Sequence, residues 1–122
     1  MQPKPSAIGV FIRDMGGYYF GAMLSGIHQA ARDAGVPLLL IQSRLDDLRL
    51  PALGAAHVAG WIVLHPIEEA TANLAALVAS GVPVLTVATA LDDVACTSVV
   101  ADNRGDTRAL VRHLIDHGLL RL

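Results

Sequence analysis

The sequence is poor in cysteine and in charge. Cys96 is the only cysteine among 122 residues, so the chain can form neither an internal disulfide nor a zinc site built on paired cysteines. Only 16% of the residues are charged, and the formal net charge is -2. Electrostatic binding of nucleic acid needs a basic stripe, and the nearest approach to one is Arg108, Arg112 and Arg121 around one helical segment. We therefore expect no direct nucleic-acid contact.

Long hydrophobic runs are also missing. The longest apolar runs fall well short of the roughly 20 residues that span a bilayer. Residues 1–6 contain two prolines and lead directly into a short apolar stretch, which is unlike a secretory leader. The sequence thus predicts a cytoplasmic protein without a membrane segment.

Apolar material is abundant, at 53% of the residues, and suits one compact globular domain. Short β-branched runs, each apolar on both faces, alternate with helical patterns, as parallel strands buried between helices do. The expected strands are Ala7–Ile12, Pro37–Ile41, Trp61–Leu64, Val82–Val87 and Ser98–Ala101.

Helical patterns separate or follow these strands. Apolar residues recur at steps of three and four along each one, and a glycine follows the three strong patterns. The pattern near Pro51–His57 is weak, because a proline fits only the first turn of a helix. The strong patterns are Tyr19–Ala34, Glu68–Ser80 and Arg104–His117, the last with Asp102 or Asn103 as its N-cap.

The alternation predicts an α/β fold: an open parallel sheet with helices on both faces. Such sheets bind ligands outside the carboxyl ends of their strands, where the strand order reverses. The loops at that edge are Arg13–Tyr18, Gln42–Asp47, His65–Glu68 and Ala88–Thr97.

Motifs for catalysis or for a cofactor are lacking. Gly16 and Gly17 lie between the first strand and a helix, but they match neither common phosphate-binding pattern, so a tight turn is favoured over a nucleotide site. No serine stands in a G-x-S-x-G elbow. His113 and His117 have the spacing of a metal pair on a helix, although a solvated pair is the favoured interpretation. We expect no cofactor, no metal and no enzymatic activity.

Several residues are nevertheless well placed to contact a ligand. Asp14 follows the first strand, and Tyr18 and Tyr19 lie at the mouth of the first helix, where a ring can stack on a flat ligand or a sugar. Phe20 belongs to the apolar stripe of that helix, which favours the core. His65 directly follows the third strand, where a ligand contact and an ordinary loop histidine are both open interpretations.

A family resemblance runs through the chain in the order of its segments. The segments that carry it are Ile8–Ile12, Tyr18–Phe20, Gly60–Pro66, Gly81–Val84 and Ser98–Asn103, followed by the helix with His113 and Gly118. Together they resemble the regulatory domain of LacI/GalR-type transcription regulators, which has the periplasmic-binding-protein-like fold of type I.

This resemblance implies a two-lobed sensor that binds a small sugar-like or nucleobase-like effector between its lobes. Residues 1–6 would be a tail, 7–101 the first lobe, and 102–122 the crossover and first helix of a second lobe. Matching positions imply ligand contacts from Gly17, Tyr19, Phe20 and His65. Where the family has an Asp-Arg pair after the fourth strand, this chain has Ala88 and Thr89, so Thr89 is the candidate contact there.

Two other functions stay open at this point. The chain has no helix-turn-helix before its first strand, so the same sensor could belong to another signalling protein, such as a cyclase or a kinase. A small flavodoxin-like or nucleotide-binding enzyme is the third hypothesis. The strand expected after Gly118 is missing, which leaves apolar surface for a second lobe or a partner to cover. Of these, a fragment that lacks its second lobe is the favoured interpretation. The resemblance also implies a homodimer, because members of the family often dimerise through helices of the first lobe and an apolar helix face here could serve as the interface.

Overall fold

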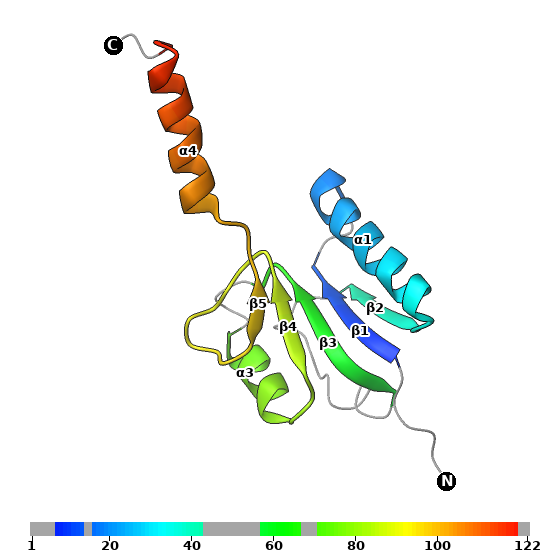
Figure 1. Ribbon diagram of the computed structural model, residues 1–122. Helices are drawn as coiled ribbons and strands as arrows, with labels where there is room; N and C mark the ends of the chain where they lie inside the picture. Colours follow the sequence, from blue (N-terminus) through cyan, green and yellow to red (C-terminus); the bar gives the residue numbers. More distant parts are fainter. Residues whose placement is uncertain (1–6, 14–15, 43–56, 67–70, 120–122) are drawn as a thin grey trace.

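The computed structural model describes residues 7–13, 16–42, 57–66 and 71–119. Five parallel strands form one open sheet in the order β2-β1-β3-β4-β5 (Figure 1). The strands are β1 (Ala7–Ile12), β2 (Leu38–Gln42), β3 (Val58–Leu64), β4 (Val84–Val87) and β5 (Thr97–Val99). The helices are α1 (Tyr18–Ala34), α3 (Thr71–Ala79) and α4 (Asn103–Asp116).

The open parallel sheet expected from the sequence is confirmed, including helices on both of its faces. Val10, Ile12 and Leu64 point to one face, where α1 covers them with its apolar stripe. We call this side the α1 face. Phe11 and Trp61 point to the opposite side, the α3 face.

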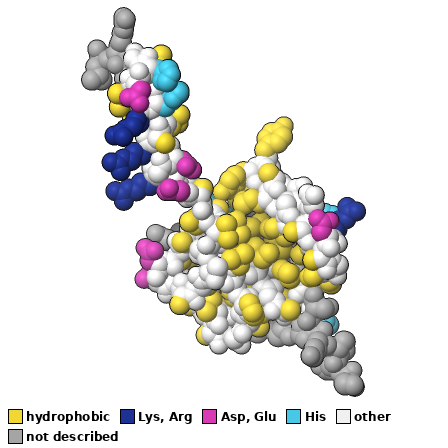
Figure 2. Space-filling view, in the orientation of Figure 1, with side chains coloured by type: hydrophobic (Ala, Val, Ile, Leu, Met, Phe, Trp, Pro, Cys, Tyr) yellow, Lys and Arg dark blue, Asp and Glu magenta, His cyan; other side chains and the backbone are white. Residues whose placement is uncertain are grey.

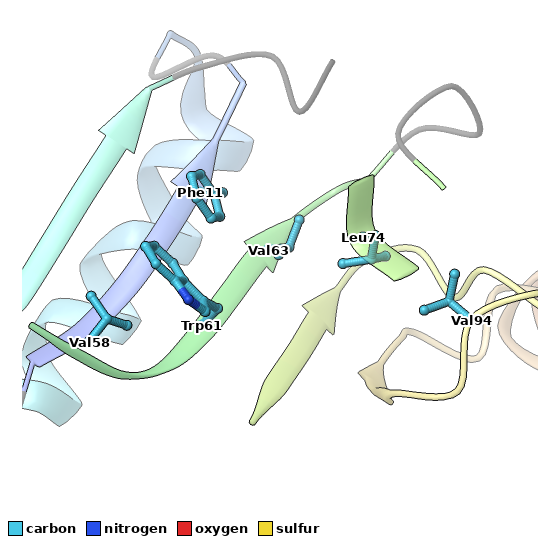
Figure 3. Packing of buried hydrophobic residues seen from close by; sticks show 6 residues of the cluster. All are labelled: Phe11, Val58, Trp61, Val63, Leu74 and Val94. Carbon is cyan, nitrogen blue, oxygen red and sulfur yellow. The ribbon is translucent and has the colours of Figure 1, made fainter. Parts of the chain in front are cut away.

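The α3 face carries the larger core cluster (Figure 3). The Phe11 and Trp61 rings stack there with centroids 4.5 Å apart, and Leu74 of α3 is fully buried in the same cluster. Gly9 lies on this face of β1, and a Cβ at that position would overlap the Trp61 ring. The absence of a side chain at Gly9 therefore makes room for the only tryptophan of the chain.

The first helix begins and ends close to where its sequence pattern predicts. It starts at Tyr18, one residue before the predicted start, and Gly35 follows it with φ 67. The Gly35 N–H donates to the Arg32 carbonyl, which satisfies one of the last carbonyls of the helix. This left-handed conformation strains any residue with a Cβ, which explains the glycine.

Several predicted boundaries were wrong by a few residues. Strand β3 begins three residues before Trp61, because Val58 and Gly60 pair with Ala7 and Ile8 of β1 across a register shift that skips Ala59. Strand β4 begins at Val84. The carbonyl of the preceding residue, Pro83, accepts a hydrogen bond from the Trp61 N–H. Strand β5 ends at Val99 rather than at Ala101. The weak helix predicted near Pro51 lies outside the described residues.

The α1 face is covered over only part of the sheet. Helix α1 packs against β1, while the register of β3, β4 and β5 aligns further apolar side chains on the same face beside it. These side chains are Ile62, Leu85 and Val87, which are half-buried, and Val99. Figure 2 shows hydrophobic side chains gathered over this part of the sheet. Val99 at its end is 56% exposed.

Helix α4 points away from the sheet (Figure 1). Its apolar stripe forms at the predicted positions, but Leu110, Val111 and Ile115 are all exposed. The predicted N-cap is confirmed: the Asp102 carboxylate accepts a hydrogen bond of 3.0 Å from the Gly105 N–H. The exposed apolar side chains in this part of the chain therefore lie on α4 and at the end of β5, where Val99 and Val100 are exposed.

Candidate functional site

The carboxyl end of β1 marks the switch point of the sheet. The chain goes from β1 to β2 on one side and then returns to β3 on the other side of β1. The loops after β1 and β3 therefore leave the sheet in opposite directions, which creates a crevice where ligands of such folds bind. The candidate residues of the sequence follow these two strands and β4.

The loop after β1 supplies two exposed aromatic rings. Gly17 is the N-cap residue of α1, with φ 88, a conformation that favours glycine. Tyr18 is 99% exposed and Tyr19 is 58% exposed, so neither ring serves the core. The predicted position of both tyrosines at the mouth of the helix is confirmed, whereas their contact with a ligand stays a prediction.

Phe20 joins the core to the candidate site. Its side chain packs against the cluster of Val10, Ile12 and Leu64, as its place in the helical stripe predicted. The same ring meets Tyr19 edge-on at 5.4 Å and His65 edge-on at 6.1 Å between centroids. Phe20 thus fixes the positions of two exposed rings from the buried side.

His65 and Thr89 come together across the ends of β3 and β4. The His65 Nδ1 and the Thr89 Oγ1 are joined by a hydrogen bond of 3.1 Å, and the tautomer of the imidazole decides which atom donates. His65 is exposed and Thr89 is half-buried. With Nδ1 engaged by the hydroxyl, the Nε2 atom is the one that remains for a ligand.

Backbone strain is concentrated at the same edge. His65 and Ala88 are the two residues other than glycine with positive φ among those described, at 51 and 75. Each directly follows the last residue of a strand, and each N–H donates to the neighbouring strand, His65 to Val87 and Ala88 to Val99. Strain of this kind costs on the order of 1–3 kcal/mol per residue and persists where the surroundings hold it. No sequence pattern indicated it.

Among the described residues that join Tyr19 to Thr89 at this edge, none is a carboxylate. Asp14, the one carboxylate predicted for it, lies outside the described residues. Arg13 follows β1 and is exposed. No carboxylate within the described residues contacts His65, so nothing there orients the imidazole as the third member of a catalytic triad would. Among the same residues no group of three metal-ligating side chains occurs.

The histidine pair with metal spacing lies on α4, outside the candidate site. His113 and His117 stack on α4 with centroids 4.1 Å apart, and the His117 ring bonds through Nδ1 to the His113 carbonyl. That hydrogen bond ends the helix and supports the interpretation as a solvated pair. Asp92 and Asp93 are exposed in a turn between β4 and β5. None of the helices in the described ranges has the length and apolarity needed to cross a bilayer.

A groove of about 600 Å³ lies elsewhere on the α1 face. It runs between α1 and the edge strand β2, with Leu24, His28 and Leu40 among its lining residues. Tyr19, His65 and Thr89 do not line it. The candidate site is therefore an exposed edge of the sheet and not an enclosed pocket. A ligand bound there would need protein on its other side as well to be largely shielded from water.

The structure describes this protein at the level of its fold class. The chain is an α/β domain with an open five-stranded parallel sheet in the order 2-1-3-4-5. Comparison with protein-family models, with curated proteins and with solved structures gives no match.

Proposed function

We propose that this chain is the effector-binding lobe of a small-molecule sensor of the LacI/GalR type. One observation carries the proposal: side chains from the first turn of α1 and from the loops after β3 and β4 lie in contact at the switch point of the sheet. Tyr19 and Phe20 follow β1, His65 follows β3 and Thr89 follows β4, and ring contacts or a hydrogen bond join each to the next.

The chemistry of these side chains suits a neutral ligand with a flat or ring-shaped body. A tyrosine ring offers a face for stacking, and the imidazole Nε2 with the tyrosine hydroxyl offers hydrogen bonds. None of these four side chains is acidic, so the set has no carboxylate that would attract a cation. Sugars and nucleobases have this combination of a ring and neutral polar groups, which agrees with the effectors that the resemblance implies.

Binding without chemical change is the activity that fits this arrangement. The Thr89 hydroxyl and the His65 imidazole are within the reach of a nucleophile and its base, but the imidazole lacks a described carboxylate to orient it. The pair is better suited to hold a hydroxyl or a ring nitrogen of a ligand. A sensor of this kind responds because its ligand binds one conformation more tightly than another.

A flavin or nucleotide site is the second candidate, because the strand order is that of flavodoxin-like domains, whose flavin binds at the same switch point. Gly16 and Gly17 precede α1 at the position where a phosphate would lie. The favoured interpretation of the glycines remains a tight turn, since Tyr18 and Tyr19 follow them directly.

The test is a binding screen with a purified, intact two-lobed protein that contains this chain. Ribose, galactose, adenine and uracil serve as probes of the proposed class, and flavin mononucleotide serves for the alternative. We expect Tyr19→Ala and His65→Ala each to weaken the binding of the tightest neutral probe by about tenfold, which corresponds to about 1.4 kcal/mol of binding free energy. Calorimetric titration measures the affinity, and thermal unfolding measures Tm.

His28→Ala provides the matched control, because His28 is an exposed histidine of α1 that lines the distant groove. The His28→Ala variant should bind the probe with the same affinity as the unchanged protein. A large fall in Tm for Tyr19→Ala with unaltered affinity would show that this ring is structural. Selective binding of flavin mononucleotide, or conversion of a probe into product, would replace the proposal with the enzyme alternative.

A further inference from the structure

We infer that Thr89 is a positioning residue: its hydroxyl donates to Nδ1 of His65 and holds the imidazole in the tautomer with its hydrogen on Nε2. The candidate site then presents a hydrogen-bond donor, so it selects a neutral ring that turns an acceptor, such as a carbonyl oxygen or a ring nitrogen, toward His65. The inference rests on the proposed function and deepens it. It starts from the hydrogen bond of 3.1 Å between these two side chains.

The hydrogen-bonding capacity of the two groups allows two arrangements. A neutral imidazole has one N–H donor and one acceptor nitrogen, whereas a threonine hydroxyl has a single hydrogen and can also accept. In the first arrangement the hydroxyl donates to Nδ1, and Nε2 carries the hydrogen of the ring. In the second arrangement the Nδ1 N–H donates to the hydroxyl, and Nε2 is an acceptor. The two arrangements therefore present opposite chemistry to a ligand.

The difference in burial favours the first arrangement. Thr89 is half-buried, whereas His65 is exposed. Among the described residues, the Thr89 side chain has its hydrogen bond with His65 and no other. If the hydroxyl accepted, its own hydrogen would lack a protein partner there, and a donor that loses water unpaired costs on the order of 1–3 kcal/mol. When the hydroxyl donates, the unpaired group is the Nε2 N–H of the exposed ring, which water or a ligand can reach.

The imidazole is held in place by its surroundings. The His65 N–H donates to the Val87 carbonyl, and the Ala88 N–H donates to the Val99 carbonyl, so both loops are tied to the neighbouring strand. The Phe20 ring meets the imidazole edge-on, with 6.1 Å between centroids. Because the backbone, the ring and Nδ1 of His65 each have a partner, the tautomer determines what a ligand meets at Nε2.

The two arrangements respond differently to acid. A protonated imidazole has an N–H at both nitrogens, so Nε2 still donates, whereas an Nε2 that accepted would lose its bond to the ligand. The described side chains in contact with His65, Phe20 and Thr89, do not titrate. Arg13 and Tyr19 are the ionisable ones nearby at the end of β1 and the start of α1. Arginine, tyrosine and carboxyl side chains ordinarily keep one charge state between about pH 5.5 and 8.

Nuclear magnetic resonance of the intact two-lobed protein tests the tautomer without a ligand. At about pH 8, where histidine is neutral, the nitrogen shifts of His65 should show a bare Nδ1 and a protonated Nε2. The signals are assigned by their loss in His65→Gln. Thr89→Val keeps the shape without the hydroxyl and should raise the population of the other tautomer, and Thr89→Ser should restore the original one. A hydrogen on Nδ1 in the unchanged protein, or equal populations in the unchanged protein and Thr89→Val, would overturn the inference.

Probe binding tests the consequence for the ligand. Thr89→Val should weaken the tightest neutral probe by about fivefold, because a smaller fraction of the protein has the competent tautomer, and Thr89→Ser should bind it as the unchanged protein does. The affinity of the unchanged protein should vary by less than about twofold between pH 5.5 and 8. A fall of about tenfold toward acid would show that Nε2 accepts and would overturn the inference. If no probe binds, the proposed function fails, whereas the resonance measurement still decides the tautomer.

Discussion

Because Gly9 has no side chain, the large aromatic residues on the α3 face can pack against β1. The Trp61 ring occupies the space that a Cβ at Gly9 would take, and it stacks on Phe11 in that position. Tight packing of this kind leaves no room for an added methyl group without a shift of the ring. The sequence alone gave Gly9 no role, because a glycine within a strand pattern indicates either a bulge or a close approach.

The substitution Gly9→Ala should lower the free energy of unfolding by about 1–3 kcal/mol, the usual cost of overpacking a core. Gly26→Ala is the matched control, since a Cβ at that exposed position of α1 meets nothing within 4 Å. This control should raise stability by about 0.5–1 kcal/mol through its helix propensity. Urea denaturation measures both values, and equal effects of the two substitutions would contradict the overlap with Trp61.

The Asp102 N-cap stabilises a single element, helix α4. Asp102→Ala removes the acceptor of the Gly105 N–H, and the loss of such a cap costs about 1 kcal/mol. Because α4 has exposed apolar positions in the structure, the loss should appear as fraying of this helix rather than as global unfolding. Hydrogen exchange of the first-turn amides should accelerate about fivefold, while that of α1 stays the same.

Asp92→Ala removes an exposed carboxylate from the turn before β5 and provides the control for charge alone. Its exchange rates in α4 should match those of the unchanged chain. Faster exchange in both variants would assign the effect to net charge, not to the cap.

Elements with strong local patterns were predicted well from the sequence. The range of β1 agrees with its prediction residue for residue, and Gly35 ends α1 as predicted, because buried β-branched runs and left-handed glycines are local signals. The start of β3 was missed because Ala59 and Gly60 have low strand propensity, and the pairing of Val58 and Gly60 with β1 depends on a register shift that no local pattern contains.

The candidate site was predicted in part for the same reason. Tyr19 and His65 follow predicted strands, and the topology of parallel sheets then brings the two loops to one edge. The hydrogen bond from Thr89 to His65 and the strain at Ala88 depend on the geometry of two neighbouring strands, which no local pattern contains.

At the scale of the whole molecule, the strand order brings the ends of β3, β4 and β5 to one edge, where hydrogen bonds join residues that are far apart in the sequence. The His65 N–H donates to the Val87 carbonyl, and the Ala88 N–H donates to the Val99 carbonyl.

The strained residue Ala88 has a mechanical consequence. Its N–H donates to the carbonyl of Val99, the last residue of β5, and Thr89 beside it contacts His65. One backbone hydrogen bond therefore joins the candidate site to the end of β5, and three residues separate Val99 from the start of α4 at Asn103. If a ligand at the candidate site displaced Thr89, the displacement would act on this hydrogen bond and shift the point from which α4 starts.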